Sequence, residues 1–300
     1  MSGPLDPQAP LREFHKSHDF FIGIDSDGCA FDTMEVKHKE CFIPSFIKHY
    51  HLAAISKYVR ETAEFVNLYS KSRGTNRFPG YVKTLDLVAN RLEVRRRNIT
   101  IPAVKGLRDW IARETKLANP SLKAEVEKTQ DPDLILAYAW SLDVNRMIEE
   151  TVQKVPPFPL VRESIQAMRN KADVMVISAT PVEALTREWE ENGLAELVAL
   201  IAGQELGGKK EVLALAAGPK RYEREQVLMI GDAPGDQNAA QTNQVLFYPI
   251  NPGHEAESWQ RFHDEALPRF FEGTYAGSYQ AERVHEFQSI LPETPPWKLA

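Results

Sequence analysis

Two short apolar runs of the sequence are each followed by aspartates. The type and spacing of these residues suit catalysis or metal binding. Asp25-Ser26-Asp27-Gly28 comes directly after residues 20–24, and Gly231-Asp232 with Asp236 follows residues 227–230. Aspartates two apart at the end of a strand can face one point where a glycine permits the chain to turn. Such carboxylates can hold a hard divalent cation, or divide into a nucleophile and a proton donor. Asp also caps helices commonly, so the first pair taken alone has a purely structural interpretation as well.

Carboxylates from the two segments would repel one another if they met at one sheet edge, unless a cation or a proton lay between them. Mg²⁺ is therefore the physical expectation, with oxygen ligands and some water molecules retained. The spacing of Asp232 and Asp236, with glycine and proline between them, allows both to face the first pair.

Two further segments offer groups that bind anions. Ser178-Ala179-Thr180 follows an apolar run at residues 174–177, and a hydroxyl with backbone N–H groups ahead of a helix makes an anion site. Gly207-Gly208-Lys209-Lys210 stands at an expected helix start, where a lysine can neutralise a carboxylate and attract a phosphoryl oxygen. Taken alone, such a serine is more often a helix cap and such a lysine more often a solvated surface charge.

The candidate residues above can form one site only if the strands that precede them end side by side. Short apolar runs predict strands at residues 20–24, 173–178, 198–202, 226–230 and 245–249. Helical patterns fill the intervals, at residues 160–171, from Pro181 to Asn192-Gly193, at 210–217, in a short helix before the last strand, and in two helices after Glu255. This alternation predicts right-handed crossovers and a Rossmann-like parallel sheet, with function at the carboxyl ends of the strands.

The stretch from Met34 to Lys154 has a helical period instead, and we expect no strand in it. Pro156-Pro157-Phe158-Pro159 makes a stiff connector that marks a domain boundary. The fold class is therefore α/β, with a core domain of residues 1–33 and 157–300 and an inserted all-helical domain of residues 34–156. Three amphipathic stripes indicate that the inserted domain is helical. They comprise Ile55, Val59, Val66 and Tyr69; Tyr81, Leu85, Val88 and Leu92; and residues 133–150.

In this order the four chemical segments resemble the haloacid dehalogenase (HAD) superfamily. The family pattern is strand-Asp-x-Asp-Gly-[Thr/Val], strand-[Ser/Thr], a lysine, and strand-Gly-Asp-x-x-x-Asp. The resemblance spans the α/β part and implies that the helical insertion is a C1-type cap. Cys29 departs from the usual Thr or Val at a position that mainly contributes its backbone, and we interpret both Cys29 and Cys41 as packing residues.

The resemblance also implies roles for the core residues. Asp25 would be the nucleophile that forms an aspartyl-phosphate, and Asp27 the general acid and base. An acid at position 27 is typical of the phosphatases and phosphomutases of the family. The remaining implied roles are phosphoryl binding by Ser178, the Ala179 N–H and Lys209 (or Lys210), and Mg²⁺ binding by Asp25, the Asp27 carbonyl, Asp232 and Asp236, the last as a ligand or an orienting group.

In such proteins the cap closes over the site and supplies specificity, which directs attention to a loop at residues 72–80. Arg73, Asn76 and Arg77 lie there among glycine and proline, and arginine forks suit phosphate or carboxylate. We take these three as tentative substrate residues. An interhelical loop with solvated arginines is the alternative, since most surface arginines bind nothing.

Composition excludes several other classes of protein. A balance of 36 basic against 42 acidic residues gives a net charge of −6, which argues against electrostatic binding of nucleic acid. Two cysteines cannot form a disulfide scaffold and fit a reducing compartment, so we expect a cytoplasmic protein. We expect no membrane span and no secretory signal. The P-loop motif and the serine-hydrolase elbow are absent from the sequence.

We therefore predict a Mg²⁺-dependent HAD-type phosphohydrolase that cleaves a small soluble phosphomonoester through Asp25. A sugar phosphomutase would share the same core residues, and a non-catalytic binding protein that kept the fold is a third hypothesis. The sequence leaves the substrate and the oligomeric state open.

Overall fold

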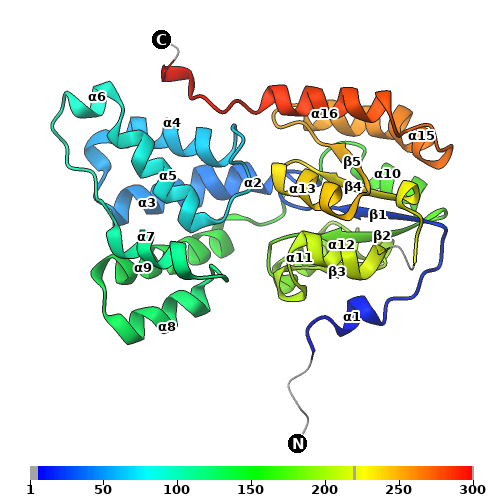
Figure 1. Cartoon of the computed structure of the whole chain (residues 1–300), viewed down its shortest axis with the longest axis horizontal. Helices are drawn as coiled ribbons and strands as arrows, with labels where there is room; N and C mark the ends of the chain where they lie inside the picture. Colours follow the sequence, from blue (N-terminus) through cyan, green and yellow to red (C-terminus); the bar gives the residue numbers. More distant parts are fainter. Residues whose placement is uncertain (1–5, 219–220, 299–300) are drawn as a thin grey trace, which may run out of the picture. The chain divides into compact units, whose positions relative to one another are not determined.

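The computed structural model describes residues 6–218 and 221–298 in two compact units. One unit comprises Met1–Thr33 with Lys154–Leu291, and the other Met34–Gln153 with Pro292–Ala300. We call them the sheet unit and the helical unit and describe each by itself (Figure 1). The first residues of the chain, where we expect no secretory signal, lie outside the described residues.

A five-stranded parallel sheet forms the centre of the sheet unit, in the order β3-β2-β1-β4-β5. The central strand is β1, and Ile24 at its end pairs with Val176 of β2 and with Ile230 of β4. The segments that follow these strands therefore start at one edge of the sheet. The predicted fold class is confirmed. The strands are β1 (Phe20–Ile24), β2 (Ala172–Ile177), β3 (Leu200–Ala202), β4 (Val227–Gly231) and β5 (Leu246–Pro249).

Alternate residues of each strand enter different hydrophobic clusters, because side chains of a strand point to opposite faces. Ile22 and Ile24 belong to one cluster, together with Trp259, whereas Phe21 belongs to a second with Phe287. Both faces of the sheet are thus covered, as a parallel sheet requires. The helices of this unit are α1 (Ala9–Arg12), α10 (Val161–Met168), α11 (Val182–Glu191), α12 (Lys209–Ala217), α13 (Pro234–Asn243), α14 (Glu255–Arg261), α15 (Leu267–Phe271) and α16 (Ser278–Ile290).

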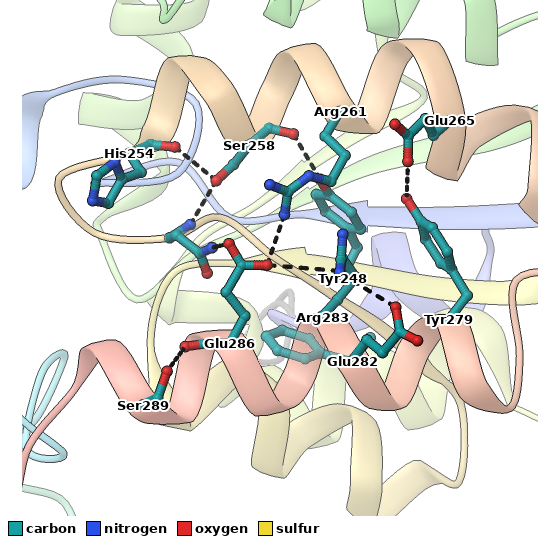
Figure 2. A network of polar contacts seen from close by, with 12 residues as sticks. Tyr248, His254, Ser258, Arg261, Glu265, Tyr279, Glu282, Arg283, Glu286 and Ser289 are labelled. Carbon is teal, nitrogen blue, oxygen red and sulfur yellow. Dashed lines mark hydrogen bonds and ion pairs between the residues drawn. The ribbon is translucent and has the colours of Figure 1, made fainter.

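The segment after β5 forms two long helical stretches, as predicted, because a π-helical turn (Phe262–Ala266) continues α14 into α15. A polar network joins the first stretch to α16 (Figure 2). Arg261 pairs with Glu286 at 2.7 Å, and the Tyr279 hydroxyl donates to Glu265 at 3.2 Å. These contacts fix α14 and α16 to each other around β5.

The helical unit is built around an aromatic core, and residues 34–153, all of them described, contain no strand. The rings of Phe46 and Tyr81 have centroids 4.6 Å apart, and those of Tyr81 and Trp140 are 4.7 Å apart. The expected all-helical character is confirmed. Its helices are α2 (Thr33–Val36, at the junction with the sheet unit), the π-helix η1 (Lys37–Phe42), α3 (Ile43–His49), α4 (Ser56–Asn67), α5 (Arg77–Ala89), α6 (Leu92–Arg95), α7 (Lys105–Arg113), α8 (Asn119–Thr129) and α9 (Pro132–Thr151).

Two details of the sequence analysis are wrong. Leu92 does not continue the buried stripe of Tyr81, Leu85 and Val88: α5 ends at Ala89, and Leu92 begins a new short helix with 58% of its surface exposed. Residues 292–298 group with the helical unit rather than with the α/β core. The Trp297 ring packs on Phe65, and the Arg91 guanidinium lies 4.4 Å from the Trp297 ring centre. Aromatic and cation–π contacts therefore hold this segment.

No helix of the described residues is long and apolar enough to cross a membrane.

Asp173 gives the sheet unit a pH-dependent contribution to stability. Its carboxylate accepts hydrogen bonds from the backbone N–H groups of Ser17 and His18 and from the Tyr222 hydroxyl. Burial by itself would raise the pKa of Asp173, but these bonds and the His18 side chain outweigh it, so the pKa is lowered. A lowered pKa stabilises the fold above the pKa of the unfolded chain, near 3.9, and the contribution is lost as the pH falls toward the folded value.

We therefore expect Asp173→Asn to lower the free energy of unfolding by about 1–3 kcal/mol at pH 7, since buried donors lose a charged acceptor. The difference from wild type should shrink in urea titrations below about pH 4, where the unfolded carboxyl is protonated too. Asp19→Asn is the matched control, because the Asp19 side chain is 83% exposed. An Asp173→Asn penalty that stays constant from pH 7 to pH 3 would contradict this account.

Candidate functional site

The first aspartate lies where β1 passes into a tight turn. The Asp25 backbone N–H donates to the Ile230 carbonyl at 3.0 Å, so pairing with β4 continues one residue beyond the strand. Asp25 is only 5% exposed, and its Oδ1 accepts the Ser26 N–H at 2.8 Å. Gly28 then adopts a φ of +76°, a left-handed conformation that glycine tolerates best, and donates to the Phe31 carbonyl. The turn therefore needs the glycine that the motif supplies.

Lys209, the first residue of α12, reaches two of the carboxylates. Its Nζ lies 2.5 Å from Asp25 Oδ2 and 2.6 Å from Asp236 Oδ1. Lys210 is exposed, and its backbone carbonyl accepts from the Asn243 side chain. Of the two lysines that the sequence left open, Lys209 is the one beside the acidic groups.

Three buried carboxylates lie close together here, and two of them contact this lysine. Asp25, Asp232 and Asp236 each offer an oxygen that lies within 4.8 Å of the others. Asp236 is held from the first turn of α13, where its Oδ2 accepts the Ala233 N–H at 3.1 Å. An all-oxygen set of this kind matches the ligands that Mg²⁺ prefers, so these residues fit the ion that the sequence predicts.

Burial governs the charges of this cluster. It raises the pKa of Asp25 to about 6, although the Lys209 ammonium opposes the shift. Burial also raises the pKa of Asp236, again against the lysine. Burial would lower the pKa of Lys209, but Asp236 and Asp25 outweigh it and raise the pKa, so the lysine is charged. A single ammonium among three acids leaves room for a further cation.

The second aspartate of the motif is positioned differently. Asp27 is only half-buried, and its two carboxylate oxygens accept hydrogen bonds from two threonines. Thr33 Oγ1 donates to Asp27 Oδ1 at 2.5 Å, and Thr180 Oγ1 donates to Oδ2 at 2.7 Å. Its side chain is not part of the group formed by Asp25, Asp232 and Asp236.

Ser178 and Ala179 directly follow β2, the strand next to β1. The Ser178 N–H donates to the Ala202 carbonyl, and the Ser178 side chain is buried beside the Thr180 N–H, which donates to its Oγ at 3.3 Å. Ala179 is exposed at the turn. The structure thus brings Ser178 and Asp27 together through Thr180, which bonds to both.

Sequence reasoning missed the residues that hold the loop between the two aspartates. Ser26 Oγ donates to Glu188 at 2.9 Å and accepts from the Trp189 indole N–H at 3.0 Å. Thr33 was also missed, and Thr180 was noted only as part of an anion-binding run. The available signal was the hydroxyl of Thr180, two residues after Ser178 and just past a predicted strand.

The tentative substrate residues belong to the helical unit, where each has a partner. Asn76 caps α5 by accepting the Phe78 N–H at 3.0 Å. Arg77 Nη1 donates to Ser141 Oγ and Asn145 Oδ1 at 2.9 and 2.8 Å. Arg73 is 3% exposed, and its Nη1 donates to the Leu68 carbonyl. Arg73 is therefore buried rather than solvated, and a role in substrate binding stays a prediction for all three.

Gly231 provides a test of how the site is packed. A Cβ added at Gly231 would lie 2.3 Å from Asp236 Cγ, so the Asp236 carboxylate would have to move. We expect Gly231→Ala to lower kcat/KM by about tenfold or more, because small displacements of catalytic groups are costly. Gly235→Ala, where an added Cβ meets nothing within 4 Å, should match the wild type. Equal activity of the two variants would contradict this packing argument.

Comparison with known proteins identifies the family. The family model for haloacid dehalogenase-like hydrolases matches residues 114–249. These residues belong to that hydrolase family. The match contains Ser178, Lys209, Asp232 and Asp236, while Asp25 and Asp27 precede it. The resemblance drawn from the motifs is confirmed over residues 114–249, which match a family of hydrolases.

Solved structures of such hydrolases resemble this chain more weakly. A HAD-like family hydrolase from Streptococcus pneumoniae shares 12% identity at a TM-score of 0.44, over 80% of this chain and 90% of that chain. A predicted phosphoglycolate phosphatase from Haemophilus somnus shares 14% at a TM-score of 0.42, over 79% and 87%. No curated protein matches. Similarity at this level assigns neither an activity nor a substrate to this chain.

Proposed function

We propose that this HAD-like hydrolase is a Mg²⁺-dependent phosphatase that cleaves a small phosphomonoester through an aspartyl-phosphate at Asp25. The observation that carries the proposal is the surroundings of Asp25: a buried carboxylate at a strand end, 2.5 Å from a lysine and grouped with Asp232 and Asp236. This arrangement supports the proposal because phosphoryl transfer needs a carboxylate that can act as nucleophile, oxygens that can bind a cation, and a positive charge close together.

The carboxylates of Asp25 and Asp232 and the carbonyl of Asp27 would hold Mg²⁺. Asp236, already bonded to Lys209 and the Ala233 N–H, would orient this set or join it. The bound ion supplies charge neutralisation for the phosphoryl oxygens. Lys209, Ser178 Oγ and the Ala179 N–H would hold the remaining oxygens of the phosphoryl group.

The reaction runs in two steps on these side chains. In the first, an Asp25 oxygen bonds to phosphorus as the ester P–O bond breaks, and Asp27 gives its proton to the departing oxygen. In the second, Asp27 takes a proton from water as the water oxygen bonds to phosphorus. The bond between phosphorus and the Asp25 oxygen then breaks, releasing inorganic phosphate and restoring the carboxylate.

Our proposal for the helical unit is that it acts as the cap and selects a small soluble metabolite, with Arg73, Asn76 and Arg77 as tentative substrate residues. An acidic balance of charge disfavours nucleic acid as substrate. The described cysteines, Cys29 and Cys41, are both buried and free, which suits the cytoplasm as the proposed location.

A screen of metabolite phosphates tests the proposal, with inorganic phosphate release measured in Mg²⁺ and in excess chelator. We expect Mg²⁺-dependent release from at least one small monoester. An isomerised sugar phosphate without phosphate release would identify a phosphomutase instead. A protein that turns over nothing and binds neither Mg²⁺ nor a fluoride mimic of phosphate would be a non-catalytic member of the fold.

A further inference from the structure

The proposed reaction gives no role to Thr180. Its side chain nevertheless contacts Asp27, the proposed general acid and base. Its Oγ1 lies 2.7 Å from Asp27 Oδ2, across a sequence separation of 153 residues. Thr180 follows β2 and Asp27 follows β1, so the bond joins two neighbouring strand ends. Asp27 is the group that must hand a proton to the leaving oxygen and later take one from water.

A structural explanation for this hydroxyl would be a helix cap, because Thr180 stands just before α11. The structure assigns the cap elsewhere. The N-cap position of α11 is Pro181, which makes no side-chain cap, and the Val182 N–H donates to Glu205 Oε2 at 2.9 Å. The Thr180 hydroxyl is directed to Asp27 instead.

The backbone of Thr180 is fixed in place. Its N–H donates to Ser178 Oγ, and its carbonyl accepts the Gln204 N–H at 3.0 Å. A Cβ at Gly203 would lie 2.6 Å from that carbonyl, so the neighbouring chain packs tightly against it. A hydroxyl on such a support holds its partner in one orientation.

A hydroxyl also suits a partner that gains and loses a proton. It donates to an ionised carboxylate and can rotate to accept from a protonated one, with no movement of heavy atoms. Amide and ammonium N–H groups can only donate and would oppose the protonated form.

We propose that Thr180 is a positioning residue whose hydroxyl holds the Asp27 carboxyl in line with the leaving oxygen. This inference rests on the proposed phosphatase function. It links two parts of the site, because the turn that presents Ser178 and Ala179 to the phosphoryl group also orients the proton donor.

The leaving group provides the test. The p-nitrophenolate ion departs without a proton, whereas an alkoxide needs one, so only alkyl esters depend on a well-placed acid. We expect Thr180→Val to lower kcat/KM by about tenfold or more for an alkyl phosphate and less than about twofold for p-nitrophenyl phosphate. Thr180→Ser keeps the hydroxyl and should recover most of the loss. In an Asp27→Asn background, Thr180→Val should cost little more.

Equal losses for both esters would show a merely structural role and overturn the inference, as would full activity of Thr180→Val or failure of the serine variant to recover. If Thr180→Val does not fold, Thr180→Ala removes the same hydroxyl and is judged by the same ratio of esters. Failure of the proposed function looks different: the wild type then hydrolyses neither ester, or Asp25→Asn remains active, and the role of Thr180 falls with it.

Discussion

Asp25→Asn should reduce hydrolysis of every phosphomonoester that the protein accepts by about 10³-fold or more, because an amide cannot form the acyl-phosphate bond. The substitution is nearly isosteric, and its buried position is otherwise unchanged. The measurement is kcat in saturating Mg²⁺, with acid-quenched protein examined for phosphate bound to residue 25. Wild type should carry the phosphate and the variant should not.

Asp19→Asn is the matched control, since Asp19 lies just ahead of β1 with its side chain 83% exposed and should keep full activity. Thermal unfolding of Asp25→Asn in chelator separates lost chemistry from lost structure. Because Asp236 still pairs with Lys209 at 2.6 Å, the variant should remain folded, with one acid fewer around the ammonium. Undiminished turnover by folded Asp25→Asn would end the proposal of a nucleophile at this position.

The sheet could be predicted because each strand carries its own signal. β1 has the predicted bounds, and the other strands lie within about two residues of the prediction, since short runs of buried β-branched and aromatic residues end at Asp, Ser or Gly. Parallel alternation then brings the ends of β1 and β4 together, which is why Asp25, Asp232 and Asp236 could be expected at one sheet edge before any geometry was known. The lysine was expected there from the resemblance to the family, with Lys209 and Lys210 as the two candidates.

Contacts that depend on side-chain direction could not be predicted. Nothing in the motif Asp25-Ser26-Asp27 tells that the serine points to Trp189 while Asp27 points to Thr180. The position of residues 292–298 could not be predicted either. This segment lacks a long periodic pattern, and the contacts of one tryptophan, Trp297, with Arg91 and Phe65 hold it in place. Tertiary contacts of single side chains leave no periodic trace in a sequence.

Lys209→Met should have the second largest effect, on both activity and stability. Without the ammonium, Asp25 and Asp236 remain buried. Among their described contacts, no other positive side chain lies at hydrogen-bond distance. Removing one partner of a buried ion pair commonly costs about 3–5 kcal/mol. Protonation of one acid would relieve part of this, so we expect the free energy of unfolding in chelator to fall by about 2–4 kcal/mol. The value of kcat/KM should fall by about 10²-fold or more, as when a group that stabilises transition-state charge is removed.

Lys210→Met distinguishes this role from a general effect of lost charge. Both lysines start α12, but Lys210 is exposed, so its variant should stay within about 0.5 kcal/mol of wild type and keep its activity. Mg²⁺ should return part of the stability of Lys209→Met, because a cation bound to the native carboxylates supplies the missing positive charge. The gain from Mg²⁺ should be larger in Lys209→Met than in wild type. If the ion stabilises neither protein, the three converging carboxylates are not a cation site, and the acidic cluster is held together by Lys209 alone.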